Sequence, residues 1–352
     1  EILKGKPAQE ALKEAKAKES KAEQALAREE WREKRDSEKA LDPLAEKKRL
    51  DEEIARLEGV IAAETALGLV DGANGRLLYR GYPIGQIVER GSYSAVAELL
   101  WTGQWTATAR LSTAPVPAPV LAALRALGPD AKPMDALRTA VSVWGATQEL
   151  AWPPTVEQAR ALTRFSPSAL AAFARLRRGL EPVEPDPSLD LVTGFLYQLN
   201  GERPDSATGR ALDAYFMVGA EHGLNASTFA ARVIVATRSD IASAVTGAIG
   251  AMKGPLHGGA PSEVVEQIHS VGSPERAEQW VRDALDRGER LMGFGHRVYR
   301  AYDPRAAALR RVAESMAHKP DWLELAIRVE DAALRVLAER HPDRPQIGRA
   351  HV

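Results

Sequence analysis

The chain has 352 residues, long enough for two packed units around sizeable hydrophobic cores. Its formal net charge is −1 with 27% charged residues, so neither the basic field of a nucleic-acid-binding protein nor an acidic tail is evident. The absence of cysteine excludes disulfides, cysteine nucleophiles and cysteine metal sites. The N-terminus is too charged for a secretory signal, and the longest weakly polar run, 241–252, is too short to span a bilayer. We therefore expect a soluble cytoplasmic protein.

The first 58 residues differ in composition from the rest. More than half of them are charged, and alanine, lysine and glutamate dominate, which favours helix. A break is expected at Asp42-Pro43, with a second helix over 44–57. The apolar positions form only a thin stripe without a sustained heptad repeat. We therefore predict a charged helical extension, which is either solvated or an arm that binds a partner. Because the chain begins with glutamate, we expect further residues upstream.

A β-hairpin is predicted soon after the change in composition at Gly59. Two apolar runs flank a turn that contains Asp71-Gly72 and Asn74-Gly75. Such pairs are the strongest short-range signal for a hairpin, since their residues tolerate the positive φ that tight turns require. We expect the hairpin between residues 69 and 84.

The remaining sequence predicts helices. Leucine and alanine recur at helical spacing, with proline or glycine between the segments. The expected helices cover 94–101, 117–127, 134–144, 155–162, 168–180, 189–199, 207–217, 306–317 and 322–340. Pro182, Pro185 and Pro187 form a stiff linker. No second strand-rich region appears, so the sequence predicts a mainly α fold.

Chemistry is concentrated between residues 253 and 305, where two histidines lie in glycine-rich turns. These turns read Gly254-Pro-Leu-His257-Gly-Gly-Ala260 and Gly293-Phe-Gly-His296-Arg-Val-Tyr-Arg300. Glycine lets backbone N–H groups approach a ligand closely. The residues alone leave two interpretations open: a shared chemical task, or two unrelated loop histidines.

The position of His257 carries a physical indication of its chemistry. Pro261 suits the first turn of a helix over 261–268, so His257 is expected just before a helix N-terminus. The positive end of the helix dipole disfavours imidazolium and favours a neutral ring. A neutral imidazole can donate a hydrogen bond to a carbonyl oxygen and stabilise an enolate. This pattern is typical of carbon-acid chemistry.

Three segments resemble signature segments of the citrate synthase family. Two are the glycine-rich turns, the second of which continues to Asp303-Pro304-Arg305, and the third is Glu221-His222-Gly-Leu-Asn225-Ala-Ser227-Thr228. The three histidines follow in the family's order, 35 and 39 positions apart. The hairpin and the loop at 196–204 are also similar to family segments.

The resemblance implies a two-domain helical fold with a small N-terminal β-hairpin. It divides the chain into a charged helical extension over 1–58, a large helical domain over 59–256, an incomplete small domain over 257–346 and a non-native tail over 347–352. It also implies a homodimer built on helix packing, with sites in a cleft that closes on the substrate.

The same resemblance implies roles for individual residues. His257 is expected to polarise the thioester carbonyl of acetyl-CoA, and His296 the keto group of oxaloacetate. Oxaloacetate is expected to be bound by His222 and Arg305, with Asn225 and Ser227 holding the rings of His222 and His257. Coenzyme A is expected to meet Arg300 at a phosphate, and the backbone of 291–295, including Leu291, Gly293 and Gly295, at its adenine.

Taken without the resemblance, several of these residues have other interpretations. A histidine near the end of an apolar helix, as His222 is predicted to be, is usually a structural group. Arginines on a surface usually face solvent, and Arg297, which has no role in the family, is expected there. The spacing of the histidines fits no metal site, and the glycines match neither a dinucleotide fingerprint nor a P-loop. We therefore expect no metal and no cofactor besides the coenzyme A thioester as a substrate.

The implied reaction is acyl transfer from acetyl-CoA to oxaloacetate, giving citrate and CoA, as in the tricarboxylic acid cycle. An alternative is a 2-methylcitrate synthase that uses propionyl-CoA. One methylene in an apolar pocket is worth only about 1–3 kcal/mol, so the sequence does not decide between them.

One departure from the family is substantial. The family's catalytic aspartate follows a stretch like His341-Pro-Asp343-Arg-Pro345, whereas this chain stops at Val352 and Asp343 lies in a different context. Two arginines expected downstream are also missing, and 347–352 look like translated adapter sequence. We therefore expect a fragment of a longer enzyme that is inactive as written. The alternative is a catalytically incompetent protein that binds CoA, oxaloacetate or a partner.

Overall fold

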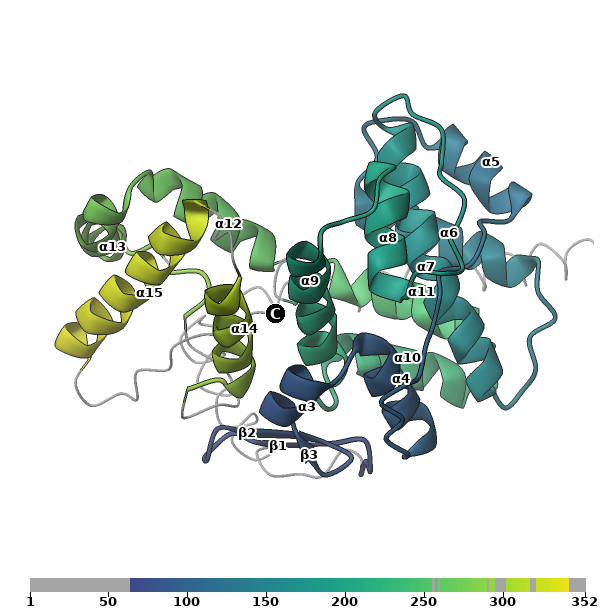
Figure 1. The fold of residues 1–352 in the computed structure, drawn as a ribbon, viewed down its shortest axis with the longest axis horizontal. Helices are drawn as coiled ribbons and strands as arrows, with labels where there is room; N and C mark the ends of the chain where they lie inside the picture. The colour runs from purple at the N-terminus through teal and green to yellow at the C-terminus, as the bar shows by residue number, and fades with distance from the viewer. Residues whose placement is uncertain are drawn as a thin grey trace, which may run out of the picture. The chain divides into compact units, whose positions relative to one another are not determined.

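The computed structural model describes residues 64–254, 257–258, 260–289, 291–294, 302–316 and 321–341. Contacts between Cα atoms divide the chain into Glu1–Glu64 and Thr65–Val352. The predicted extension over 1–58 lies outside the described residues. The described part of the second unit is mostly helical (Figure 1), which confirms the predicted mainly α fold.

The predicted hairpin is present. Strand β1 (Gly68–Asp71) pairs antiparallel with β2 (Arg76–Tyr79), and β2 pairs with a two-residue strand, β3 (Tyr82–Pro83), which the sequence did not predict. The Asp71 carboxylate closes the turn by accepting hydrogen bonds from the backbone and side-chain N–H groups of Asn74. Leu77 and Tyr79, two positions apart on β2, both lie on the same buried face of the sheet. This face of the small sheet covers a helical core.

Three helices pack beneath the sheet or beside it: α3 (Ile84–Arg90), α4 (Tyr93–Thr102) and α9 (Ser206–Gly219). A fourth helix, α8 (Leu191–Asn200), packs against α4 and α9. Side chains at their starts accept the unpaired N–H groups of the first turn, Ser92 for α4, Asp190 for α8 and Asp205 for α9. The core that α3, α4 and α9 share with the sheet contains Leu77, Tyr79, Ile84, Ile87, Val96, Leu99, Ala214 and Met217.

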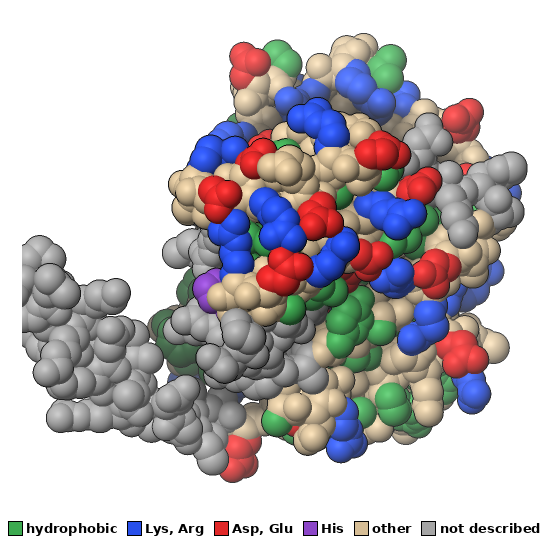
Figure 2. All heavy atoms as spheres, turned by 90° about the vertical axis from the view of Figure 1, so that its left-hand side faces the viewer, with side chains coloured by type: hydrophobic (Ala, Val, Ile, Leu, Met, Phe, Trp, Pro, Cys, Tyr) green, Lys and Arg blue, Asp and Glu red, His purple; other side chains and the backbone are tan. Residues whose placement is uncertain are grey.

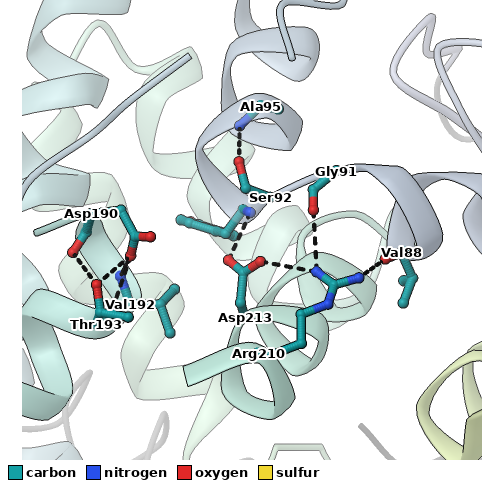
Figure 3. Close-up of polar contacts among 10 residues, drawn as sticks. Val88, Gly91, Ser92, Ala95, Asp190, Val192, Thr193, Arg210 and Asp213 are labelled. Atoms are coloured by element: carbon teal, nitrogen blue, oxygen red, sulfur yellow. Dashed lines mark hydrogen bonds and ion pairs between the residues drawn. The ribbon is translucent and has the colours of Figure 1, made fainter. Parts of the chain in front are cut away.

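An ion pair between Arg210 and Asp213, 3.4 Å apart, lies in α9 and faces the turn between α3 and α4 (Figure 3). Arg210 donates hydrogen bonds to the carbonyl groups of Gly91, at 3.1 Å, and Val88. Asp213, one turn further along α9, accepts from the N–H group of Tyr93 at 2.9 Å. Burial raises the pKa of the Asp213 carboxyl, and the Tyr93 hydrogen bond opposes that rise.

A second core lies among α5 (Ala118–Ala126), α6 (Pro133–Ala146), α7 (Val156–Leu176) and α11 (Ile241–Met252). The prediction of two separate helices over 155–162 and 168–180 was wrong, because α7 runs without interruption through Pro167. A proline inside a helix costs about 3 kcal/mol. The burial of Phe165 and Phe173, worth about 1.5–3 kcal/mol each, offsets that cost.

The sequence prediction assigned no helix to α3, to α10 (Ala226–Ala236), to α11 or to α13 (Ala277–Asp286). In α11 the glycines look like breaks, yet one of them, Gly247, allows close packing of helices. A Cβ at Gly247 would lie 2.2 Å from Cδ1 of Ile234 on α10. Glycine therefore marks a helix contact here, because the approach leaves no space for a side chain.

Three helices near the end of the chain share a further core: α12 (Ala260–Val271), α13 and α15 (Asp321–Arg340), joined by the 3₁₀ turn Pro274–Arg276. Their outer face shows interspersed basic and acidic side chains (Figure 2). On these helices Arg282 pairs with Glu278 and Glu339. Helix α14 (Pro304–Ser315) packs instead against α3 and α9, through Ala308. The predicted boundary between domains at 256 and 257 stays a prediction.

Candidate active site

His257 lies in the turn between α11 and α12, three positions before α12 begins at Ala260. Its backbone N–H donates to the carbonyl of Gly254 at 3.0 Å, which closes the turn. Pro261 is in the first turn of α12, where its missing N–H has no intrahelical partner to lose. The histidine ring is therefore held just ahead of a helix N-terminus.

A short chain of hydrogen bonds ties this ring to the start of α10. Nε2 of His257 lies 2.9 Å from Oγ of Ser227, and that hydroxyl donates to Oδ1 of Asn225 at 2.7 Å. Asn225 is the N-cap of α10, and Oδ1 also accepts the N–H of Thr228 at 2.9 Å. The structure thus joins His257, Ser227 and Asn225, which come from two separate sequence segments.

The directions of these hydrogen bonds determine which ring nitrogen of His257 carries the proton. The amide orientation of Asn225 follows from the Thr228 N–H, which needs an acceptor oxygen opposite it. Because Ser227 has one hydroxyl proton and gives it to Asn225, Nε2 of His257 is the donor to Ser227. The hydroxyl of Ser227 therefore decides which ring nitrogen of His257 carries hydrogen.

His222 lies in the loop between α9 and α10, after the last turn of α9 rather than within the helix. Its neighbour Glu221 accepts the N–H of Gly223 at 2.6 Å, and Gly223 has a φ of 70°, which favours glycine. Burial raises the pKa of the Glu221 carboxyl, and the hydrogen bond from Gly223 opposes the rise. This loop leads directly into the Asn225 cap.

Arg305 is buried, with 6% of its surface exposed, at the start of α14. Its Nε and Nη2 atoms donate to the two carboxylate oxygens of Asp303, at 3.1 and 2.8 Å. Asp303 is fully buried and also caps α14 by accepting the N–H of Arg305. No role is predicted for Asp303 from the motifs, although an aspartate directly before a helix start favours an N-cap, and arginine pairs well with a carboxylate.

The segment predicted to meet coenzyme A is described only in part. Leu291, Met292 and Phe294 line an apolar cavity of about 280 Å³ among α12, α13, α14 and α15. Gly293 has a φ of 93°, and the N–H of Met292 donates to Oε1 of Gln267 on α12. Gln267 is a further anchor of this segment that the sequence analysis missed.

The remaining predicted site residues, His296, Arg300 and Gly295, lie outside the described residues, as does Arg297. Within the described ranges, no three histidine, aspartate or glutamate side chains gather in a way that could hold a metal ion. None of the helices that the structure describes is long and apolar enough to cross a membrane.

Comparison with known proteins gives this site a context. The family model described as citrate synthase, C-terminal domain, matches residues 56–347. A citrate synthase of Haloferax volcanii is 42% identical over 295 residues, which cover 78% of each chain. A 2-methylcitrate synthase of Mycobacterium tuberculosis is 40% identical over 282 residues, covering 76% of this chain and 72% of the relative.

Solved structures agree with these matches. The citrate synthase of Thermotoga maritima has a TM-score of 0.69 at 34% identity, covering 81% of this chain and 78% of that one. The Thermoplasma acidophilum enzyme, solved as a ternary complex with carboxymethyl coenzyme A and oxaloacetate, has a TM-score of 0.72 at 27% identity, covering 81% and 80%. Fold and matches together define a condensing enzyme of the acyltransferase type. The chain belongs to the citrate synthase family.

Proposed function

We propose that the site around His257 condenses acetyl-CoA with oxaloacetate to give citrate and CoA. The contact between His257 and Ser227 carries the proposal, because it joins two family segments, 30 positions apart, at the starts of α10 and α12. The names of the relatives and the carboxymethyl coenzyme A and oxaloacetate in a related structure support it.

In the proposed reaction the family's catalytic aspartate, which is not identified in this sequence, takes a proton from the acetyl methyl group, and charge develops on the thioester oxygen. A hydrogen bond from His257 stabilises that oxygen. The methyl carbon then forms a bond to the keto carbon of oxaloacetate, whose oxygen takes up a proton. Water cleaves the thioester of the resulting citryl-CoA, which releases citrate and CoA.

The hydrogen bonds of the site add a step to this scheme. With Nε2 donating to Ser227, a neutral His257 has a lone pair at Nδ1, which is unable to donate to a carbonyl. If Ser227 turns its hydroxyl proton from Asn225 to Nε2, Nε2 gives up its own proton to water and Nδ1 takes up a proton from water. We propose that His257 meets the thioester oxygen in this second tautomer, while Asn225 keeps its bond to Thr228.

Oxaloacetate is proposed to lie between His222, Arg305 and His296. The paired contact with Asp303 holds the guanidinium plane of Arg305 in one orientation before substrate arrives. An arginine fixed in this way loses less side-chain freedom when a carboxylate binds. The roles of His296 and Arg300 rest on the family resemblance alone.

The choice of acyl donor is a separate proposal. We favour acetyl-CoA, with propionyl-CoA as the second candidate because the 2-methylcitrate synthase relative is nearly as similar as the citrate synthase. The two thioesters differ by one methylene, so a preference of about 10- to 200-fold in kcat/KM is the most that the pocket is expected to give.

A second copy of the chain is proposed as the partner. Helix α10 has only Ser227 buried, whereas Phe229 and Val233, one turn apart, are 55% and 50% exposed. An apolar face of this kind suits a homodimer interface. Sedimentation should give the mass of a dimer, and Phe229→Glu should give a monomer. A wild-type monomer would contradict this proposal.

Calorimetric titration of the 352-residue chain tests the function. We expect oxaloacetate and acetyl-CoA each to bind, and His257→Ala to leave the affinity for oxaloacetate similar. If neither compound binds, the proposed function is wrong. The prediction that the chain as written is inactive is tested separately, by thiol release from acetyl-CoA plus oxaloacetate. Release above background would contradict that prediction and support the condensation directly.

A further inference from the structure

The loop that carries His222 is held by a side chain from the N-terminal sheet. Tyr79 on β2 is fully buried, and its hydroxyl donates to the carbonyl of Val218 at 3.0 Å. The same hydroxyl accepts the N–H of Glu221 at 3.3 Å. One oxygen therefore bridges the last turn of α9 and the residue next to His222.

The Tyr79 hydroxyl supplies a hydrogen-bond donor to a backbone carbonyl at the end of α9. Val218 lies in the last turn of α9, where carbonyl groups have no N–H partner within the helix. A buried carbonyl without a partner is costly, and the Tyr79 hydroxyl supplies the partner. Phenylalanine would fill the same space without satisfying either group, so the hydroxyl rather than the ring is the informative feature.

The sheet touches the loop at a second point. Gly68 on β1 lies opposite Tyr79 in the strand register. A Cβ at Gly68 would lie 2.9 Å from Cγ and 3.3 Å from Oε1 of Glu221. Strands β1 and β2 therefore both contact Glu221, the residue beside His222.

This anchor is continuous with the bonds around His257. The Glu221 carboxylate accepts from Gly223, and the Gly223 carbonyl accepts from the N–H of Asn225 at 3.0 Å. Asn225 then leads through Ser227 to the ring of His257. Arg210 and Asp213 hold α9 nearer its N-terminus (Figure 3), so the loop leaves a helix that is also held upstream.

We infer that Tyr79 is a positioning residue for the proposed reaction, which holds the His222 loop in the geometry that binds a carboxylate of oxaloacetate. The inference rests on the proposed function. Tyr79 acts through the loop backbone and is not proposed to touch the substrate.

The test compares Tyr79→Phe with Tyr82→Phe. Tyr82 belongs to the same sheet but is 42% exposed, and its ring lies tilted beside that of Trp105, so its variant controls for loss of a tyrosine hydroxyl. Calorimetry of the 352-residue chain should show that Tyr79→Phe weakens oxaloacetate binding about tenfold, because the loop without its anchor occupies the binding geometry about a tenth as often, and leaves acetyl-CoA affinity similar. Equal loss for both ligands, or no loss for either, would overturn the inference.

Amide hydrogen exchange of the ligand-free chain separates the two proposals. Tyr79→Phe should raise exchange in residues 219–225, and Tyr82→Phe should not. If wild type binds no oxaloacetate, the proposed function fails, and the exchange result still decides whether Tyr79 holds the loop. Unchanged exchange in Tyr79→Phe would refute that role.

A second variant covers the case in which Tyr79→Phe does not fold. Gly68→Ala keeps the Tyr79 hydroxyl but displaces the Glu221 side chain, and it should produce the same selective loss of oxaloacetate affinity. A Gly68→Ala chain with wild-type affinity for oxaloacetate would count against the positioning role.

Discussion

Replacing Ser227 by alanine removes one oxygen that serves two partners. Ser227 is 7% exposed, and its hydroxyl lies 2.9 Å from Nε2 of His257 and 2.7 Å from Oδ1 of Asn225. The variant leaves the backbone cap of α10 in place, because Asn225 still accepts the N–H of Thr228. The change is therefore confined to the two bonds of this hydroxyl, one to the His257 ring and one to Asn225.

The magnitude follows from the hydrogen bonds that are lost. A neutral hydrogen bond contributes about 0.5–1.5 kcal/mol, and a half-buried donor left without a partner costs about 1–3 kcal/mol. Asn225 keeps one donor, so its share of the loss is small. We expect Ser227→Ala to lower the free energy of unfolding by about 1–3 kcal/mol.

Two measurements check this expectation. Urea denaturation gives the free energy, and the ¹⁵N chemical shifts of the imidazole report which ring nitrogen is protonated. Wild type should show hydrogen on Nε2, and Ser227→Ala should shift His257 toward a mixture of tautomers. Ser315→Ala is a matched control, because that exposed hydroxyl donates only to the carbonyl of Val312 among the contacts described. If Ser227→Ala changes neither the shifts nor the stability, the proposed control of the tautomer is wrong.

Other predictions concern the arginine pair, helix packing and pH. Asp303→Ala leaves the buried guanidinium of Arg305 without its carboxylate and should cost about 3–5 kcal/mol in urea denaturation, whereas a loss below about 1 kcal/mol would contradict the pairing. Gly247→Ala places a Cβ 2.2 Å from Ile234 and should lower the free energy of unfolding by about 1–3 kcal/mol. Gly250→Ala, whose Cβ would meet nothing within 4 Å, should raise it by about 0.5–1 kcal/mol. Equal thermal unfolding midpoints for the two variants would refute the packing argument. The raised pKa of Asp213 means that the folded state binds its proton more tightly than the unfolded state, so this contribution to stability is present below pH 3.8 and is lost as pH rises through the folded pKa. The free energy of unfolding should therefore fall less steeply with pH just above pH 3.8 in Asp213→Asn than in wild type. An unchanged slope in the variant would count against the raised pKa of Asp213.

The general fold was accessible from the sequence because its signals are local. The Asp-Gly and Asn-Gly turn predicted the hairpin, and most long leucine- and alanine-rich segments formed helices near their expected bounds. The errors arose where distant contacts decide. Pro167 looks like a break but lies in a helix whose phenylalanines are buried, and Gly247 permits close approach to Ile234.

The site was accessible from the sequence only in part. Motif resemblance identified His257, Ser227 and Asn225, and the structure brings these three into contact. The support given by Tyr79 was not predictable, because its partner Val218 lies 139 positions away and depends on the packing of the sheet on α9. The pairing of Asp303 with Arg305 was local, and the spacing of an N-cap could have indicated it.

A crystal structure of this chain with oxaloacetate and carboxymethyl coenzyme A tests the central claim most directly. The account predicts the carboxymethyl group within about 3 Å of Nδ1 of His257, and a carboxylate of oxaloacetate at His222 and Arg305. Finding the two compounds bound away from the turn between α11 and α12 would contradict it.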